Sequence, residues 1–212
     1  MLALRAGSVA ILCNKMVVVV EIKEKVMATA TTRETLDDLY RVEGKAELIG
    51  GRIVHFMSAG HLPGRVAGNI FIGLRLFTKS IRRGEAHADG IGFAVPEMAS
   101  GRESFSPDAS CYFGPLPVNL MRFIDGAPDF AAEVRSENDY TRSAEIEMAA
   151  KRDDYFAAGT KIVWDVDPEA ETVTKYRADD PANSVVFRMG DIADAEPAVP
   201  GWKMAVADIF AD

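Results

Sequence analysis

The sequence has little cysteine, little histidine and no excess of positive charge. Its 212 residues include 2 Cys and 3 His, and 24 Lys plus Arg stand against 32 Asp plus Glu, a formal net charge of −8. Cys13 and Cys111 are too few for a disulfide scaffold, so a reducing, cytoplasmic compartment is expected. His55, His61 and His87 lack the HxH or HExxH spacing of a zinc site. Bulk coating of nucleic acid is excluded, because counterion release needs clustered Lys and Arg.

Long apolar runs are also missing. The stretch Gly7–Val20 is interrupted by Asn-Lys and falls short of the ~20 apolar residues that a membrane span needs. It continues into the charged run Glu21–Lys25 and not into a small-residue cleavage site, so it does not resemble a signal peptide. We therefore predict no membrane association. We expect residues 1–26 to be an N-terminal extension, either a start-site artefact or a loosely attached strand, and residues 27–212 to form one domain.

The remaining composition is that of an ordinary globular domain, with 48% hydrophobic and 26% charged residues. A domain of this size buries roughly 70% of the surface of its unfolded chain, enough for a core without metal or disulfides. The order of elements is neither a βαβ alternation nor a β meander, which predicts a mixed α/β fold with a β-sheet flanked by helices. The predicted elements are a short helix after a capping box at Thr31–Glu34, a hairpin of 46–49 and 52–57, a helix over 64–83, strands at 92–95, 108–113 and 129–136, a helix over 143–158, strands over 161–167 and 172–177, and a loop-rich stretch over 178–201.

Two of the predicted strands carry ionisable side chains on one face only. Successive side chains of a strand point to opposite faces, so each strand has one apolar and one polar face. The polar faces hold Asp108, Ser110 and Tyr112 on the first strand and Asp129, Glu133 and Arg135 on the second. The opposite faces hold Ala109, Cys111 and Phe113, and Phe130, Ala132 and Val134.

If these strands pair, Asp108 and Glu133 converge on one divalent cation. Hard cations such as Mg²⁺ bind carboxylate oxygens and keep several waters, and they polarise phosphoryl oxygens. Arg135 or Lys151 would then offset the charge that develops on a phosphate. The alternative is that these are ordinary surface strands, which often carry alternating carboxylates in acidic proteins. Spacing alone leaves both interpretations open.

The order of several short motifs adds a resemblance. Pro107-Asp108, followed by Glu133-Val134-Arg135, is similar to the PD-(D/E)xK nuclease superfamily. The wider pattern, over about residues 33–210, resembles the Uma-type restriction endonuclease family. The matching stretches are Glu47–Ile49, Gly51–Val54, Ser58–Gly60, Ser106–Asp108, Gly126–Ser136, Lys151 with Tyr155 and Gly159, Val163-Trp164, Asp167-Pro168, Pro200–Trp202 and Asp208–Phe210.

This resemblance implies a restriction-endonuclease-like core that hydrolyses DNA phosphodiester bonds with Mg²⁺ or Mn²⁺. Asp108 and Glu133 would be the metal ligands, and Glu47 a further acidic member of the site. Lys151 would be the catalytic lysine, moved from the strand to the following helix.

Four residues depart from the family pattern, among them Gly50, where the family often has Asp, and Pro63, where many relatives have His. Arg135 holds the position of the strand lysine, and because arginine does not give up its proton we expect it to contact phosphate and not to act as a base. Asp165 occupies a strand position that is usually apolar in the family.

Contact with DNA must come from a local patch. The polar face of the predicted helix over 64–83 offers one, although a merely solvated helix face is the commoner explanation of such clusters. Cutting both strands of a duplex with one site per chain would favour a homodimer. The alternative function is a catalytically inactive nuclease-fold module that binds nucleic acid or a protein partner, which would have no need of a metal ion. The patch residues are Arg75, Lys79, Arg82 and Arg83.

Overall fold

The computed structural model describes residues 7–13, 16–22 and 32–212. The chain divides into two compact units, Met1–Thr32 and Arg33–Asp212. In the first unit, strands β1 (Gly7–Cys13) and β2 (Met16–Ile22) pair as an antiparallel hairpin. No helix in the described part of the chain is long and apolar enough to cross a bilayer.

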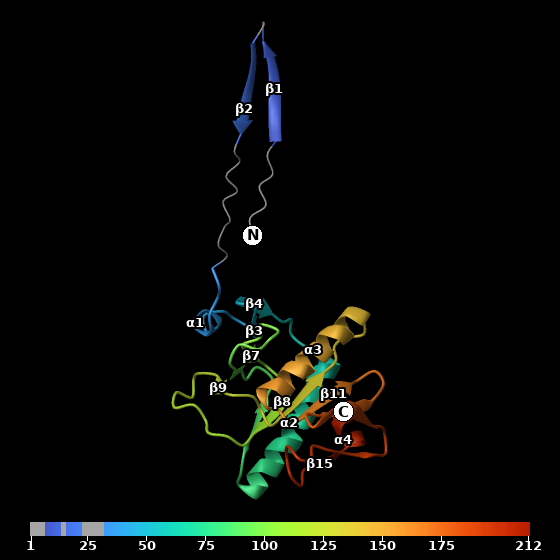
Figure 1. The fold of residues 1–212 in the computed structure, drawn as a ribbon. Helices are drawn as coiled ribbons and strands as arrows, with labels where there is room; N and C mark the ends of the chain where they lie inside the picture. Colours follow the sequence, from blue (N-terminus) through green and yellow to red (C-terminus); the bar gives the residue numbers. More distant parts are fainter. Residues whose placement is uncertain (1–6, 14–15, 23–31) are drawn as a thin grey trace. The chain divides into compact units, whose positions relative to one another are not determined.

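The second unit is built on a six-stranded sheet with the order β13-β12-β11-β10-β8-β5. Strands β10 and β11 run parallel, and every other neighbouring pair is antiparallel. The parallel pair is joined by helix α3, as a parallel connection requires. The sheet is therefore mixed and flanked by helices, which confirms the predicted fold class (Figure 1). Its strands are β5 (Glu85–Ala88), β8 (Ala109–Tyr112), β10 (Phe130–Val134), β11 (Ile162–Asp167), β12 (Thr172–Arg177) and β13 (Asp180–Phe187).

Helices α2 (His61–Ile81) and α4 (Val206–Phe210) cover one face of this sheet. The buried residues of α2 recur at helical spacing, and Ile70 and Leu74 are fully buried. They pack against the apolar strand positions, including Cys111, which lies on the core face as expected. Burial raises the pKa of this thiol to about 12, which suits a small core residue and not a nucleophile.

Helix α3 (Arg142–Ala158) covers the opposite face together with smaller sheets. The Thr141 side chain accepts a hydrogen bond from the Ala144 backbone and so begins α3. Tyr155 of α3 is buried and stacks on Phe105, with 4.1 Å between ring centroids. The other elements of this unit are α1 (Leu36–Leu39), β3 (Ala46–Ile49), β4 (Arg52–His55), β6 (Phe93–Ala94), β7 (Ser104–Phe105), β9 (Ile124–Asp125), β14 (Ile192–Asp194) and β15 (Lys203–Ala205).

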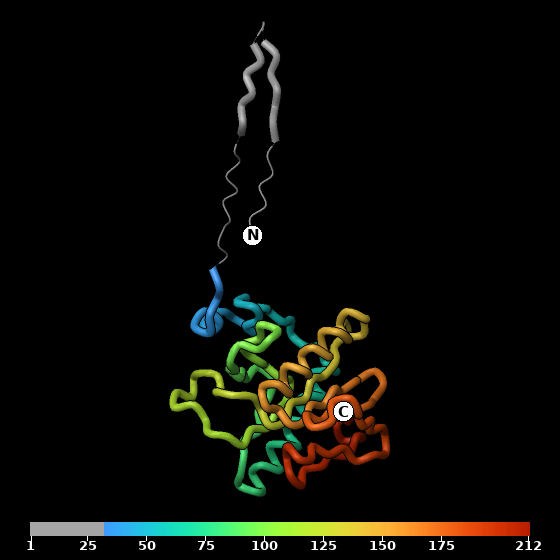
Figure 2. The backbone as a smooth tube through the Cα atoms, in the orientation of Figure 1, coloured from blue at the N-terminus to red at the C-terminus, as the bar shows by residue number. Residues whose placement is uncertain are grey.

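Several elements differ from the sequence prediction, which also lacks strands β7, β9 and β15 and helix α4. The capping box is formed by Thr35 and Asp38, and not at Thr31–Glu34, of which residue 31 lies outside the described residues. Strand β5 was not predicted. The stretch expected to be loop-rich contains β13 and β14, because β13 is an exposed edge strand held by its backbone pairing with β12 and not by an apolar pattern. Figure 2 shows the course of this backbone through the second unit.

Candidate active site

Asp108 and Glu133 lie on neighbouring strands of the central sheet. Strands β8 and β10 pair antiparallel, with Ala109 opposite Ala132, which confirms the pairing on which the predicted site depends. Asp108 immediately precedes β8, and its Oδ2 accepts a hydrogen bond of 2.8 Å from the Val134 backbone N–H. The Asp108 carboxylate is thus fastened to the strand that carries Glu133.

The alternation of faces is also as predicted. Phe130, Ala132 and Val134 pack in the core beneath α2, whereas Ala131 and Glu133 face α3. Both carboxylates therefore belong to the layer between the sheet and α3.

Glu133 receives two donors from helix α3. The Tyr155 hydroxyl donates to Glu133 Oε1 at 2.6 Å, and Lys151 Nζ lies 2.9 Å from the same oxygen. Burial raises the pKa of the Glu133 carboxyl; Lys151 opposes this shift and the negative charge of Asp108 adds to it. A divalent cation beside Glu133 would relieve this cost, because it favours the charged carboxylate.

Glu47, on β3, is fully buried and accepts donors on both oxygens. Its Oε1 lies 2.9 Å from the Ser106 backbone N–H and 3.2 Å from Lys151 Nζ, and its Oε2 accepts a hydrogen bond from the Arg102 guanidinium. Burial alone would raise the Glu47 pKa, but Lys151 and Arg102 outweigh it and hold the pKa below its ordinary value. Arg102 Nε also donates a hydrogen bond of 3.0 Å to Asp154 Oδ2 on α3.

Lys151 is thereby held between Glu133 and Glu47. Burial lowers the pKa of its ammonium group, but the two carboxylates outweigh burial, and the net pKa is raised. Lys151 is thus a protonated donor and not a general base. The structure brings together all four candidates expected from the sequence: Asp108, Glu133, Lys151 and Glu47.

Lys45 is a member of this cluster that sequence reasoning missed. Its Nζ lies 2.6 Å from Asp108 Oδ1 and 2.7 Å from Asp89 Oδ1. The signal available was its position two residues before Glu47 and directly before the predicted strand 46–49, because extended backbone would place both side chains on one face. Its partner Asp89 follows β5, which was not predicted. Arg102 and Asp154 were also missed, because they are distant from Glu47 in the sequence and only the folded chain brings the three residues together.

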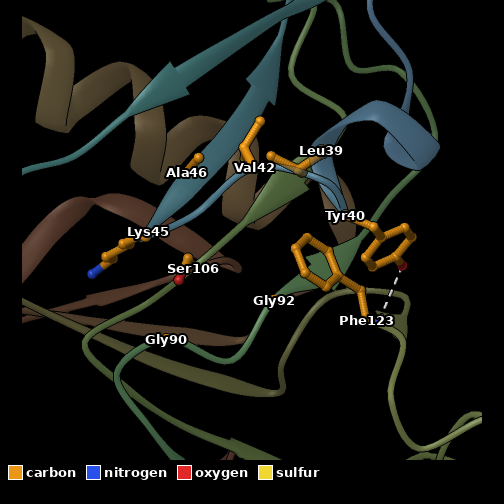
Figure 3. Close-up of a pocket in the computed structure, with 10 residues that line it drawn as sticks. Leu39, Tyr40, Val42, Lys45, Ala46, Gly90, Gly92, Ser106 and Phe123 are labelled. Atoms are coloured by element: carbon orange, nitrogen blue, oxygen red, sulfur yellow. Dashed lines mark hydrogen bonds between the residues drawn. The ribbon is translucent and has the colours of Figure 1, made fainter.

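A small cavity adjoins this cluster (Figure 3). It has a volume of about 170 Å³, and both Lys45 and Ser106 line it. Tyr40 and Phe123 form its aromatic wall, with their rings edge-on at 4.9 Å and the Phe123 backbone N–H donating to the Tyr40 hydroxyl.

The net formal charge of the cluster equals in size the charge of one divalent cation and is opposite in sign. Five carboxylates, Asp89, Asp108, Glu133, Glu47 and Asp154, stand against three cations, Lys45, Lys151 and Arg102, a formal charge of −2. Within residues 32–212 and the described strands before them, no three His, Cys, Asp or Glu side chains form a ready metal-ligand group. Mg²⁺ needs no such group, since one or two carboxylates commonly hold it with water completing the shell. Asp108 and Glu133 fit this donor set.

Arg135 lies near the site but is already engaged. Its Nε and Nη2 form two hydrogen bonds of 2.9 Å with Asp165, and its other side-chain hydrogen bonds are with Glu145 of α3. Arg135 and Asp165, which both depart from the family pattern, are thus partners in one bidentate ion pair.

The basic residues of α2 are not brought to the carboxylates. Helix α2 covers the opposite face of the sheet, so Arg75 and Lys79 on the helix, and Arg82 and Arg83 directly after it, belong to a different layer. Arg75 faces Glu85 at 3.5 Å, and Arg83 lies over the Phe113 ring at 5.5 Å.

Comparison with protein families matches residues 33–207 to the Uma2 family, described as "Putative restriction endonuclease". This chain belongs to the Uma2 family. Uma2 membership supports a nuclease-type function with nucleic acid as the substrate class. A crystal structure described as a "putative nuclease belonging to DUF820" from Anabaena variabilis shares the fold of this Uma2 chain. The TM-score is 0.63 at 20% identity, over 83% of this chain and 97% of that one. Comparison with curated proteins found no match.

Proposed function

We propose that this Uma2-family protein is a metal-dependent endonuclease that hydrolyses phosphodiester bonds in DNA. The observation that carries the proposal is the convergence of Asp108, Glu133 and Lys151 in one buried, net-negative cluster. Its proposed setting is the cytoplasm, as the free Cys111 thiol suits a reducing compartment.

Asp108 and Glu133 are the proposed ligands of Mg²⁺ or Mn²⁺. The bound ion would polarise a phosphoryl oxygen and lower the pKa of a water. Tyr155 orients the Glu133 carboxylate through its 2.6 Å hydrogen bond, and the Val134 backbone N–H orients Asp108. Both carboxylates are thereby fixed before a metal ion binds.

Lys151 is the proposed catalytic cation. Because its ammonium group stays protonated, it donates hydrogen bonds to a water or to the phosphate as negative charge develops. Glu47 holds Lys151 in place and is itself fixed by Arg102. Hydrolysis adds water across one P–O bond: the water oxygen bonds to phosphorus, and the leaving oxygen takes a proton.

Arg135 and the basic residues of α2 are the proposed phosphate contacts, and a second copy of the chain is the proposed partner for cutting both strands. Residues on α2 would reach DNA that wraps beyond the carboxylate layer. Arg135 would reach a phosphate through its exposed side, where Glu145 now binds it. These basic residues are Arg75 and Lys79 on α2 and Arg82 and Arg83 directly after its end.

Plasmid cleavage tests the proposal. The purified protein should nick or linearise plasmid DNA with Mn²⁺ and not with EDTA, and Asp108→Ala should remove the activity. Calorimetry should show Mn²⁺ binding that Glu133→Gln weakens more than Asp129→Asn. Asp129 is a matched control, because it lies on the same strand segment but pairs with Lys161 and the Phe113 backbone.

The alternative is a nuclease-fold module without activity. The specific observation that favours it is that lysine and arginine already neutralise several carboxylates of the cluster. A protein that binds no Mn²⁺ at millimolar concentration, yet retains nucleic acid or a protein partner, would establish the alternative.

A further inference from the structure

Lys45 occupies a position that resembles a cation site. Its ammonium group lies between two carboxylate oxygens, 2.6 Å from Asp108 and 2.7 Å from Asp89. The position therefore holds a positive charge between two negative ones.

Lys45 shares Asp108 with the proposed metal ion. Lys45 uses Asp108 Oδ1, and the Val134 backbone uses Oδ2, so a metal ion between Asp108 and Glu133 would bind directly beside the lysine. In enzymes with two metal ions, one carboxylate commonly bridges a pair of ions about 3.5–4 Å apart. Asp108 would hold the corresponding position here, between Lys45 and the proposed ion.

Solvent access distinguishes Lys45 from Lys151, which also bridges two carboxylates. The partner of Lys151, Glu47, is fully buried and already bound by Arg102. The partner of Lys45, Asp89, has a side chain that is 44% exposed. A hydrated ion from solution could therefore approach the Lys45 position from the side of Asp89, whereas the side of Lys151 that faces Glu47 is closed.

We propose that Lys45 is a built-in cation that limits this site to one divalent metal ion, by taking the place of a second ion between Asp89 and Asp108. The inference rests on the proposed function, since it assumes a first ion on Asp108 and Glu133. One divalent ion balances the formal charge of −2 of the cluster. Without the Lys45 charge the cluster stands at −3, and the additional negative charge lies between Asp89 and Asp108, where a second ion can bind.

Counting bound Mn²⁺ tests the proposal, and the count does not depend on activity. Calorimetric titration of the full chain should give one ion for the wild type and two for Lys45→Met. Lys45→Arg keeps the charge and should bind one. The double variant Lys45→Met/Asp89→Asn removes one positive and one negative charge together and should return the count to one.

A second variant, Lys45→Gln, keeps the test decisive if Lys45→Met proves too unstable to titrate. Lys45→Gln can still hydrogen-bond both carboxylates and should also bind two ions, and its Mn²⁺ electron paramagnetic resonance spectrum should show coupling between neighbouring ions. One ion in the wild type and one in both Lys45→Met and Lys45→Gln overturns the role of Lys45 and leaves the proposed function standing. No ion in the wild type overturns the proposed metal site, and this inference with it.

Discussion

Lys151 Nζ lies 2.9 Å from Glu133 Oε1 and 3.2 Å from Glu47 Oε1, so one ammonium group joins helix α3 to the central sheet and to the β3–β4 hairpin. The lysine side chain is 17% exposed and Glu47 is not exposed at all. In this low-dielectric environment a fixed positive charge acts strongly on a nearby developing negative charge. The same contacts make Lys151 important for folding.

Lys151→Ala should reduce DNA cleavage by about 100- to 1,000-fold, because it removes a donor that acts mainly in the transition state. Metal and DNA binding should change far less, which calorimetry and a filter-binding assay would measure. Lys161→Ala is the control, since Lys161 forms an exposed pair with Asp129. Normal cleavage by Lys151→Ala, together with raised activity of Arg135→Lys, would place the catalytic lysine at position 135.

Arg102→Met should destabilise the protein by about 3–5 kcal/mol, because it leaves the buried Glu47 carboxylate with fewer partners. Adding Glu47→Gln should recover part of the loss, since the buried charge is then removed as well. Arg33→Met is the control and should change stability little, because Arg33 forms its ion pairs with Glu97 and Glu103 at the exposed surface. Urea unfolding measures all three variants, and equal losses for Arg102→Met and Arg33→Met would contradict this account.

Local patterns made the strands of the site predictable. Alternation along β8 and β10 fixes which side chains share a face, but it was the resemblance to the nuclease family that assigned Asp108 and Glu133 to one site; the pairing of the two strands is seen only in the structure. Gly50 and Gly51 both have positive φ, +60° and +67°, as a tight hairpin turn between β3 and β4 requires.

Contacts between distant segments could not be predicted in the same way. Lys45 reaches Asp89 only because β5 lies beside β8, and no motif marks β5 in the sequence. Strand β13 is exposed along most of its length, so its sequence shows no alternation of buried apolar and exposed polar residues from which the strand could be predicted. Asp165 looks out of place in a buried strand until Arg135 is seen to pair with it.

Arg135 provides a test of phosphate contact. Arg135→Ala should weaken DNA binding and lower the slope of log affinity against log salt by about 1, because one phosphate contact is lost. Glu145→Gln should have the opposite effect on affinity, since it removes the carboxylate that competes with phosphate for the Arg135 guanidinium. Glu147→Gln is the matched control, because Glu147 lies on the same helix and bonds only to Ser143 among the described side chains. An unchanged salt slope in Arg135→Ala would contradict the phosphate contact and leave Arg135 with only its structural role as the partner of Asp165.

His87 should make the stability depend on pH below neutrality. The ring packs edge-on against Phe93, and among the residues described its buried Nε2 has no hydrogen-bond partner. Burial lowers the His87 pKa below its ordinary value of 6.5; Arg75 lowers it further and Glu85 opposes them. As the pH falls through 6.5, the unfolded chain therefore binds a proton that the folded chain does not, and the free energy of unfolding decreases. His87→Asn should flatten the fall in melting temperature between about pH 7.5 and pH 5.5, whereas His55→Asn and His61→Asn, at exposed positions, should not. A fall of the same size in His87→Asn and in the wild type would show that other groups control this pH range.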